Sequence, residues 1–208
     1  QESAAAVVMD VQTGDIVAIC SSPSFDPNKF VRGISSADYR GLMQHELRPL
    51  ADKTVQGLYP PGSTLKMIAA VAALEAGLTD PLSTFEACAG SLRVGDTVFH
   101  CFNRDGHGEL NLLEAIEASC NIYFNHLAQI LGIEAWHGYG ALFGFGSPTQ
   151  IDLDPSELSG ILPDRQYHKE REGWVTGHLM NLVIGQGYML VTPLQMARYV
   201  AALGNGGA

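Results

Sequence analysis

A serine and a lysine three residues apart, in Ser63-Thr64-Leu65-Lys66, have the types and spacing of a nucleophile and its base. Positions i and i+3 of a helix share a face, so Lys66 can lie within hydrogen-bond reach of the Ser63 hydroxyl. A helix N-terminus disfavours an ammonium, and a partly buried Lys66 could therefore be neutral enough to accept the serine proton. The alternative is an N-capping serine followed by a surface lysine, because S-x-x-K arises by chance about once in a chain of this length.

A second hydroxyl and an amide occur further along the chain, in Ser119-Cys120-Asn121. We expect this tripeptide between two helices. The alternative is ordinary capping of the following helix, which would explain either residue alone. A similar tripeptide, Ser36-Ala37-Asp38, precedes the nucleophile and is set aside.

Three cysteines and a histidine gather in the middle of the chain, at Cys88, Cys101, His107 and Cys120. Three thiolates and one imidazole form a known closed tetrahedral zinc site, although this spacing is not that of a zinc finger or ribbon. A Cys88–Cys101 disulfide and free thiols are the alternatives. We expect Cys20 to be a small core residue. No role is assigned to His126, His137, His168 and His178.

The elements that must position these residues follow from turn signals and periodicity. Leu58–Gly62 cannot be helical because it contains two prolines, whereas Ser63–Ala76 is built from helix formers and ends before Gly77. Only one hairpin is predicted, from Ala5–Val11 and Ile16–Cys20 joined through Gly14. The other expected elements are a β-rich segment over 85–108, helices over 111–118 and 123–131, a loop over 143–159, and a capped helix over 192–203.

The composition is that of a globular protein, with 46% hydrophobic and 16% charged residues among 208. The formal net charge is −10 and no basic cluster occurs, which argues against nucleic acid as a partner. The longest apolar run, Met67–Leu74, is far shorter than the roughly 20 residues that span a bilayer.

The stretch Tyr59–Lys66 closely resembles the active-site entrance of penicillin-binding proteins, whose motifs are S-x-x-K, a serine-amide motif and K-T-G. Ser119-Cys120-Asn121 is similar to the second motif. The resemblance extends to Val8–Gly14, Ser22–Asn28, Ile184–Tyr188 and Thr192–Ala197. By this resemblance the chain is identified as a class B penicillin-binding protein transpeptidase domain, most similar to the elongation-type group, penicillin-binding protein 2.

The resemblance implies an α/β (α+β) fold in which helices flank an antiparallel sheet and an all-helical lobe borders the active site. Residues 1–208 would be one domain that supplies the first hairpin and the helical lobe. No K-T-G or K-S-G occurs in the sequence, so we expect the third motif and the final strands beyond residue 208. Residues 1–208 alone are therefore expected to be unstable and not to acylate measurably.

The implied activity is a serine-type peptidoglycan D,D-transpeptidase acting on D-Ala–D-Ala stem peptides and trapped by β-lactams. Ser63 would be the nucleophile, Lys66 its base, Ser119 a proton carrier, and Asn121 a ligand of the substrate amide. No cofactor is expected for catalysis, but the resemblance supports structural zinc at the cysteine and histidine cluster. The implied partners are a SEDS-family glycosyltransferase and the elongation complex, at the periplasmic face of the bacterial inner membrane, with the anchor outside this chain.

Three rival functions share these motifs. A serine β-lactamase has the first two motifs but needs a water-activating group for deacylation. A β-lactam sensor, or a catalytically dead scaffold of a wall-synthesis complex, would not turn over substrate. The intact Ser63, Lys66, Ser119 and Asn121 argue against the dead scaffold.

Overall fold

The computed structural model describes residues 2–152 and 156–207, which fall into two compact units. The first unit takes in Gln1–Tyr59, Phe143–Gly160 and Val191–Ala208, and the second takes in Pro60–Leu142 and Ile161–Leu190. Each contains helices and one small antiparallel sheet, so the α+β class is confirmed.

The first unit contains the predicted hairpin. Strands β1 (Ala4–Met9) and β2 (Ile16–Ser22) pair antiparallel, with a bulge at Val8/Met9. The turn closes because an Asp10 carboxylate oxygen accepts the backbone N–H groups of Gln12 and Thr13. Gly14 has φ +75°, a conformation that costs glycine little.

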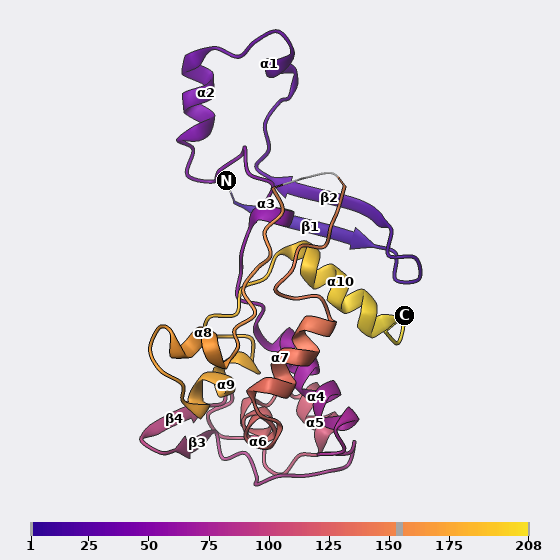
Figure 1. Cartoon of the computed structure of the whole chain (residues 1–208), viewed down its shortest axis with the longest axis vertical. Helices are drawn as coiled ribbons and strands as arrows, with labels where there is room; N and C mark the ends of the chain where they lie inside the picture. The colour runs from indigo at the N-terminus through magenta and orange to yellow at the C-terminus, as the bar shows by residue number, and fades with distance from the viewer. Residues whose placement is uncertain (1, 153–155, 208) are drawn as a thin grey trace. The chain divides into compact units, whose positions relative to one another are not determined.

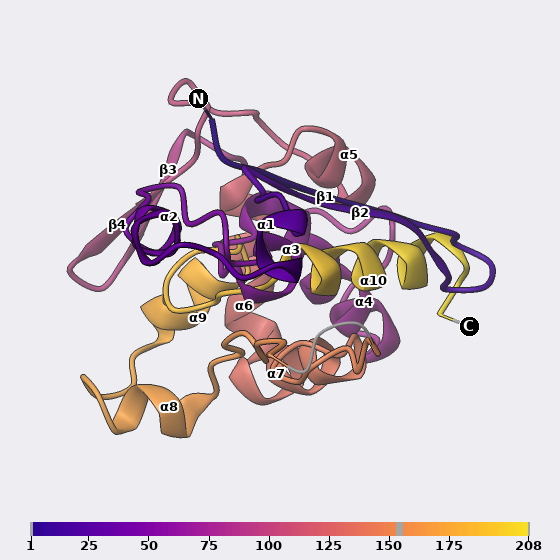
Figure 2. The ribbon, with the colours of Figure 1, turned by 90° about the horizontal axis from the view of Figure 1, so that it is seen from above.

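Helix α10 (Pro193–Gly204) lies along β1 and also contacts the short helix α3 (Lys53–Gln56) (Figures 1 and 2). Its start has the predicted cap, since Thr192 and Gln195 form a capping box and proline follows the cap. The side-chain amide of Gln195 donates to the carbonyl oxygens of two loop residues, Ser147 and Ser159. The helix therefore also holds two points of the loop over 143–159.

The remaining segments of the first unit are irregular or short. Helices α1 (Asn28–Val31) and α2 (Ser36–Met43) contain no buried residue, and Ser35 caps α2. The set-aside tripeptide Ser36-Ala37-Asp38 is thus the first turn of an exposed helix. The loop predicted over 143–159 carries no helix or strand where it is described, and residues 153–155 lie outside the described part of the chain.

The second unit is built around helix α4 (Lys66–Glu75), which contacts α5 (Leu112–Glu117), α6 (Asn121–Leu131) and α7 (Ile133–Leu142). Buried alanines on α4 leave space for its neighbours to approach closely. The bulkiest buried side chains of this unit, Phe124 and Trp136, come from the neighbouring helices, and α4 adds Ile68. Close packing of this kind holds the start of α4 near the start of α6.

A second two-stranded sheet corrects the expectation of a single hairpin. Strands β3 (Ser91–Val94) and β4 (Thr97–His100) pair antiparallel within the predicted β-rich segment. Gly95 has φ +59° in the two-residue connection Gly95-Asp96. A glycine followed by a polar residue between two β-prone runs is a hairpin signal, but strands of four residues are too short to give a clear alternating pattern.

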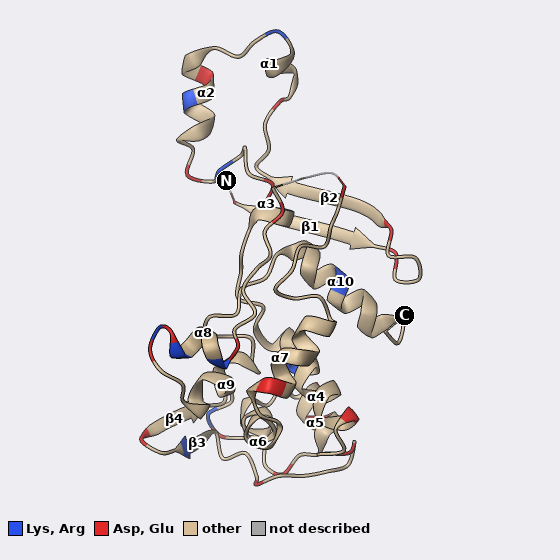
Figure 3. Cartoon of the chain, in the orientation of Figure 1, with Lys and Arg blue, Asp and Glu red and all other residues tan. Residues whose placement is uncertain are grey.

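Two short helices complete the second unit, α8 (Arg165–Lys169) and α9 (Thr176–Leu182). Figure 3 shows Lys and Arg scattered over both units, with acidic residues beside those of α8. Among the described residues, no helix combines the length and apolar character that crossing a bilayer requires.

Candidate active site

Ser63 lies in a tight turn directly before α4. Gly62–Leu65 forms a short 3-10 helix that continues into α4 at Lys66, whereas the sequence predicted an α-helix from Ser63 onward. Residues i and i+3 of a 3-10 helix are eclipsed, so Ser63 and Lys66 still share a face. The Ser63 side chain is exposed, and no described residue forms a hydrogen bond with its hydroxyl.

The turn that carries Ser63 is held by a glycine far along the chain. The backbone N–H of Gly62 donates to the Gly185 carbonyl at 2.9 Å. A Cβ on Gly185 would lie 2.0 Å from the Gly62 carbonyl oxygen, and Gly185 has φ +68°. Only glycine fits this contact without displacing the turn. Gly185 lies in the Ile184–Tyr188 segment that carries part of the family resemblance, and its contact with Gly62 has no signal in the sequence.

Lys66 is buried, with 3% of its surface exposed, and makes three hydrogen bonds to the second motif. Its Nζ donates to the Ser119 carbonyl at 2.6 Å, to Ser119 Oγ at 2.9 Å and to Asn121 Oδ1 at 2.8 Å. Nζ also lies 5.7 Å from the centroid of the Phe124 ring. The two predicted motifs therefore meet, although Lys66 contacts Ser119 and Asn121 and not the Ser63 hydroxyl.

Burial lowers the pKa of Lys66 from 10.5 to about 8, because the ammonium loses hydration there. Charge on the Cys101 and Cys120 sulfurs would act in the opposite direction. A lysine with a pKa near 8 has a substantial neutral fraction close to neutral pH. Such an amine can accept a proton.

The three acceptors around Lys66 differ in whether they can also donate a hydrogen bond. An ammonium has three N–H donors, which match the three acceptors in the charged state. The carbonyl oxygens of Ser119 and Asn121 can only accept hydrogen bonds. When Lys66 is neutral, the Ser119 hydroxyl is the only one of the three partners that can donate a proton to its lone pair.

Ser119 adopts a strained backbone conformation in the turn between α5 and α6. Its φ is +50°, in the left-handed region that non-glycine residues rarely occupy. The turn is held by backbone bonds from Ser119 and Cys120 to α5, and Cys120 caps α6. The Asn121 side-chain nitrogen donates to the His100 carbonyl at 3.2 Å. These contacts fix the orientation of both polar side chains toward Lys66.

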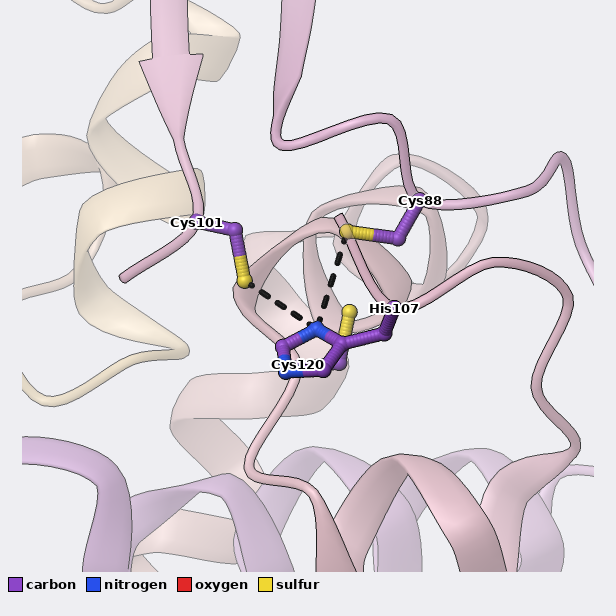
Figure 4. Close-up of side chains that lie close together, drawn as sticks. All are labelled: Cys88, Cys101, His107 and Cys120. Atoms are coloured by element: carbon purple, nitrogen blue, oxygen red, sulfur yellow. Dashed lines mark hydrogen bonds between the residues drawn. The ribbon is translucent and has the colours of Figure 1, made fainter. Parts of the chain in front are cut away.

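The predicted cysteine and histidine residues also lie together (Figure 4). The Nδ1 atom of His107 is 3.7 Å from Cys88 Sγ and 3.5 Å from Cys101 Sγ. One ligand atom from each of Cys88, Cys101, His107 and Cys120 lies within 4.8 Å of the others. All four cysteines of the chain are free thiols, including Cys20, which is exposed and not in the core as expected.

The donor set fits a tetrahedral zinc ion. Zinc–sulfur bonds of about 2.3 Å and zinc–nitrogen bonds of about 2.0 Å place sulfur and nitrogen ligands about 3.6 Å apart, close to the distances at His107. Burial acts to raise the pKa of the Cys101 thiol, but backbone N–H groups of Asn121 and Asn103 outweigh it and lower the pKa. The protein alone therefore favours the thiolate form at Cys101, whereas burial raises the pKa of the Cys120 thiol to about 12.

A second cluster of possible metal ligands, which the sequence did not predict, consists of His168, Glu172 and His178. The two imidazole rings stack with centroids 4.2 Å apart and planes 9° from parallel, and Glu172 lies near both. The lone pairs of imidazole nitrogens lie in the ring plane. Parallel stacked rings cannot direct them at one ion, so this arrangement is a packing contact and not a metal centre.

Comparison with known proteins places this geometry in a family. Residues 4–208 match the penicillin binding protein transpeptidase domain. The chain is 38% identical over 209 residues to the peptidoglycan D,D-transpeptidase MrdA of Salmonella typhimurium, covering 99% of this chain and 33% of that protein. The chain thus spans about a third of the length of the curated relatives it matches.

Solved structures agree with this match. The Pseudomonas aeruginosa PBP2 structure in complex with WCK 5153 is 40% identical, with a TM-score of 0.93 over 98% of this chain and 45% of that one. The Helicobacter pylori PBP2 in its complex with MreC is 33% identical, with a TM-score of 0.91 over 97% of this chain and 38% of that one. The chain therefore belongs to the penicillin-binding protein transpeptidase family, and its transpeptidase domain is of the PBP2 (MrdA) type.

Proposed function

We propose that this chain is part of a peptidoglycan D,D-transpeptidase in which Ser63 carries the acyl group of a stem peptide ending in D-Ala–D-Ala. The observation that carries the proposal is the buried Lys66, one turn after Ser63, with its amine bonded to Ser119 and Asn121. A buried amine of lowered pKa beside a serine is the arrangement that activates a hydroxyl nucleophile. The name of the Salmonella relative, a D,D-transpeptidase, agrees with it.

In the proposed acylation, the Ser63 oxygen attacks the carbonyl of the penultimate D-Ala as Lys66 takes the serine proton. The tetrahedral intermediate collapses, the C–N bond breaks, and the terminal D-Ala amine receives a proton through the Ser119 hydroxyl. The Lys66–Ser119 hydrogen bond provides a direct route for that proton. Asn121 would hold the substrate amide.

In the proposed second half-reaction, an amine of a neighbouring stem peptide attacks the acyl-enzyme. The amine loses its proton through Ser119 and Lys66, a new amide bond forms, and the Ser63 oxygen is released with a proton. The Ser63 backbone N–H is proposed as one oxyanion donor. The family's K-T-G strand would provide the other, and that motif is not in these 208 residues.

A β-lactamase is the rival reading of the same acyl-serine chemistry. Such an enzyme needs a group that activates water for rapid deacylation. In the described part of the chain, none of the hydrogen bonds made by the side chains of Lys66, Ser119 and Asn121 goes to a carboxylate. This favours a long-lived acyl-enzyme and hence the transpeptidase.

The test is labelling with fluorescent penicillin in the intact protein. We expect one adduct, on Ser63, that persists for hours, and no adduct in Ser63→Ala. An adduct that clears in seconds would favour the β-lactamase. Labelling that survives in Ser63→Ala would show that Ser63 is not the nucleophile.

We also propose that Cys88, Cys101, His107 and Cys120 hold one structural zinc ion. Four protein ligands leave no open position, so the ion would supply cross-linking and no catalytic step. Since Cys120 lies between Ser119 and Asn121, the ion would fix the turn that presents both. We expect Cys101→Ser to lower the melting temperature and the acylation rate together. Metal analysis finding less than about a tenth of an equivalent would contradict this proposal.

The family also suggests where the protein works. We propose that the intact protein acts at the periplasmic face of the inner membrane, in an elongation complex with a SEDS-family glycosyltransferase. The solved structures support this only at the level of assembly: one is the Helicobacter PBP2 complex with MreC, and another is described as a peptidoglycan synthase complex. Co-purification of the intact protein with such a glycosyltransferase is the direct test.

A further inference from the structure

A pocket of about 430 Å³ with a mixed polar and apolar lining opens beside Asn121 in the second unit. Its wall is formed by strand β4 and the residues that follow it, and by α6 and the α9 region. Asn121 lines the pocket through the same side chain that bonds to Lys66. The pocket is therefore continuous with the proposed catalytic centre.

The lining is rich in side-chain amides. Besides Asn121, these are Asn125, Asn181 and Gln186. The side chains of Asn181 and Gln186 form no hydrogen bond with any described residue, and the Oδ1 atom of the buried Asn125 has no partner either. An unpaired buried carbonyl oxygen costs free energy, so native structures rarely keep one without a reason.

Amide side chains offer both a donor and an acceptor, which is the complement of a peptide bond. Polar groups of this kind, placed in a pocket, fix the orientation of a ligand. Asn121 and Asn125 are four residues apart on α6 and so lie on one face of that helix. They form a row of amides that runs from Lys66 into the pocket.

Arg104 is the one charged side chain among the residues that line this pocket. It is exposed, and no described residue forms an ion pair or a hydrogen bond with its guanidinium. The chain as a whole has a net charge of −10, so this guanidinium is a local positive centre on an acidic molecule. A guanidinium binds a carboxylate with two parallel hydrogen bonds.

From these contacts we infer that the pocket binds the part of the acyl-donor peptide that precedes the attacked bond, and that Arg104 selects a peptide carrying a free carboxylate there. The inference rests on the proposed function, because it uses the same substrate. A peptide with its reacting carbonyl at Ser63 and its amide at Asn121 continues into this pocket. Arg104 is thus a specificity-determining residue.

The experiment compares two stem-type peptides ending in D-Ala–D-Ala, one with a free carboxylate before the dipeptide and one with that group as a carboxamide. Binding is measured in intact Ser63→Ala protein, which cannot be acylated at Ser63. We expect the carboxylate peptide to bind about tenfold more tightly than the carboxamide peptide. That factor corresponds to the low end of the range for hydrogen bonds to charged groups. Arg104→Gln should remove this preference.

Arg93→Gln is the matched control, because Arg93 is an exposed arginine on β3 outside the pocket. It should leave the preference intact. Equal binding of the two peptides by the Ser63→Ala protein, or the same loss in both arginine variants, would overturn the inference. In protein with Ser63 intact, Arg104→Gln should slow acylation by the carboxylate peptide while penicillin labelling is unchanged. An effect confined to attack by the acceptor amine would also overturn the donor assignment.

Binding and labelling separate the two proposals. A failure of penicillin to label Ser63 would count against the proposed transpeptidase chemistry, whatever the peptides do. Binding to the Ser63→Ala protein does not depend on that chemistry and reports on the pocket directly.

Discussion

At the scale of single residues, Lys66 determines the electrostatics of the proposed site. It is buried against Phe124 and bonded to Ser119 and Asn121, so its charged form loses water without gaining a carboxylate partner. The neutral form is the one that can accept a proton from Ser63. The lowered pKa therefore translates directly into a pH dependence of acylation.

We expect the rate of Ser63 acylation by penicillin to rise with pH and to level off above a midpoint near 8. Below that pH Lys66 is an ammonium and cannot accept the serine proton, and above it the amine is free. Stopped-flow acylation from pH 6 to 10 gives the profile. Lys66→Arg should be slow throughout, because its guanidinium stays charged. A wild-type rate that still rises at pH 10 with no sign of levelling off would mean that burial does not perturb this lysine.

Ser119 combines strain with a proposed proton-transfer role. Its φ of +50° suits glycine better than any residue with a Cβ. Ser119→Gly and Ser119→Ala both remove the hydroxyl that bonds to Lys66, and each should lower acylation by about 10²-fold or more. Ser119→Gly should nevertheless be more stable than Ser119→Ala by roughly 0.5–1 kcal/mol, since it relieves the strain. Urea unfolding of both variants measures the difference, and equal stabilities would show that the turn relaxes.

At the scale of elements, the nucleophile turn depends on a contact that no single element contains. The 3-10 helix at Gly62–Leu65 leads into α4, and its first N–H is held by the Gly185 carbonyl after α9. The position of Ser63 therefore depends on how closely the Gly185 backbone approaches Gly62.

Gly185→Ala should displace this turn and slow acylation, because the added Cβ would meet the Gly62 backbone. Gly187→Ala is a matched control. Gly187 has a similar φ of +74°, but a Cβ there would meet only ordinary contacts at 3.6 Å or more. Both variants share the backbone strain, and only the first disturbs the turn. We expect a loss of about tenfold or more in penicillin labelling rate for Gly185→Ala relative to Gly187→Ala, consistent with the sensitivity of catalysis to small displacements. Equal rates would show that the contact does not position Ser63.

At the scale of the whole molecule, the two units have separate cores, and the proposed site lies within one of them. The four proposed catalytic residues, the cysteine and histidine cluster and the amide pocket all belong to the second unit. The first unit has its own buried residues around α10, including Leu194 and Tyr199. Damage to one core should therefore be separable from damage to the site.

Leu194→Ala and Leu127→Ala make this comparison, because both side chains are fully buried and lie in different units. Each substitution should cost about 2–5 kcal/mol in unfolding free energy. Only Leu127→Ala, on α6 with Asn121, should also lower the acylation rate of the folded fraction. The rate is corrected for that fraction by unfolding curves at the same temperature. An equal loss of rate in Leu194→Ala would contradict the separation.

The sequence by itself determined the residue types of the site and the elements that hold them. The first hairpin, the helix after Ser63 and the capped final helix follow from local turn chemistry, capping and helix propensity. The cysteine and histidine cluster was predicted from ligand chemistry and from family resemblance. These signals act over a few residues, or depend on residue type alone, and so can be read along the chain.

Only the tertiary structure decided how the distant segments meet. The contact of Gly185 with Gly62 and the partners of Lys66 depend on packing between segments more than fifty residues apart. The unpaired Arg104 at the amide pocket has no sequence signature either. Burial and the approach of distant backbones set these features, and no local propensity encodes them.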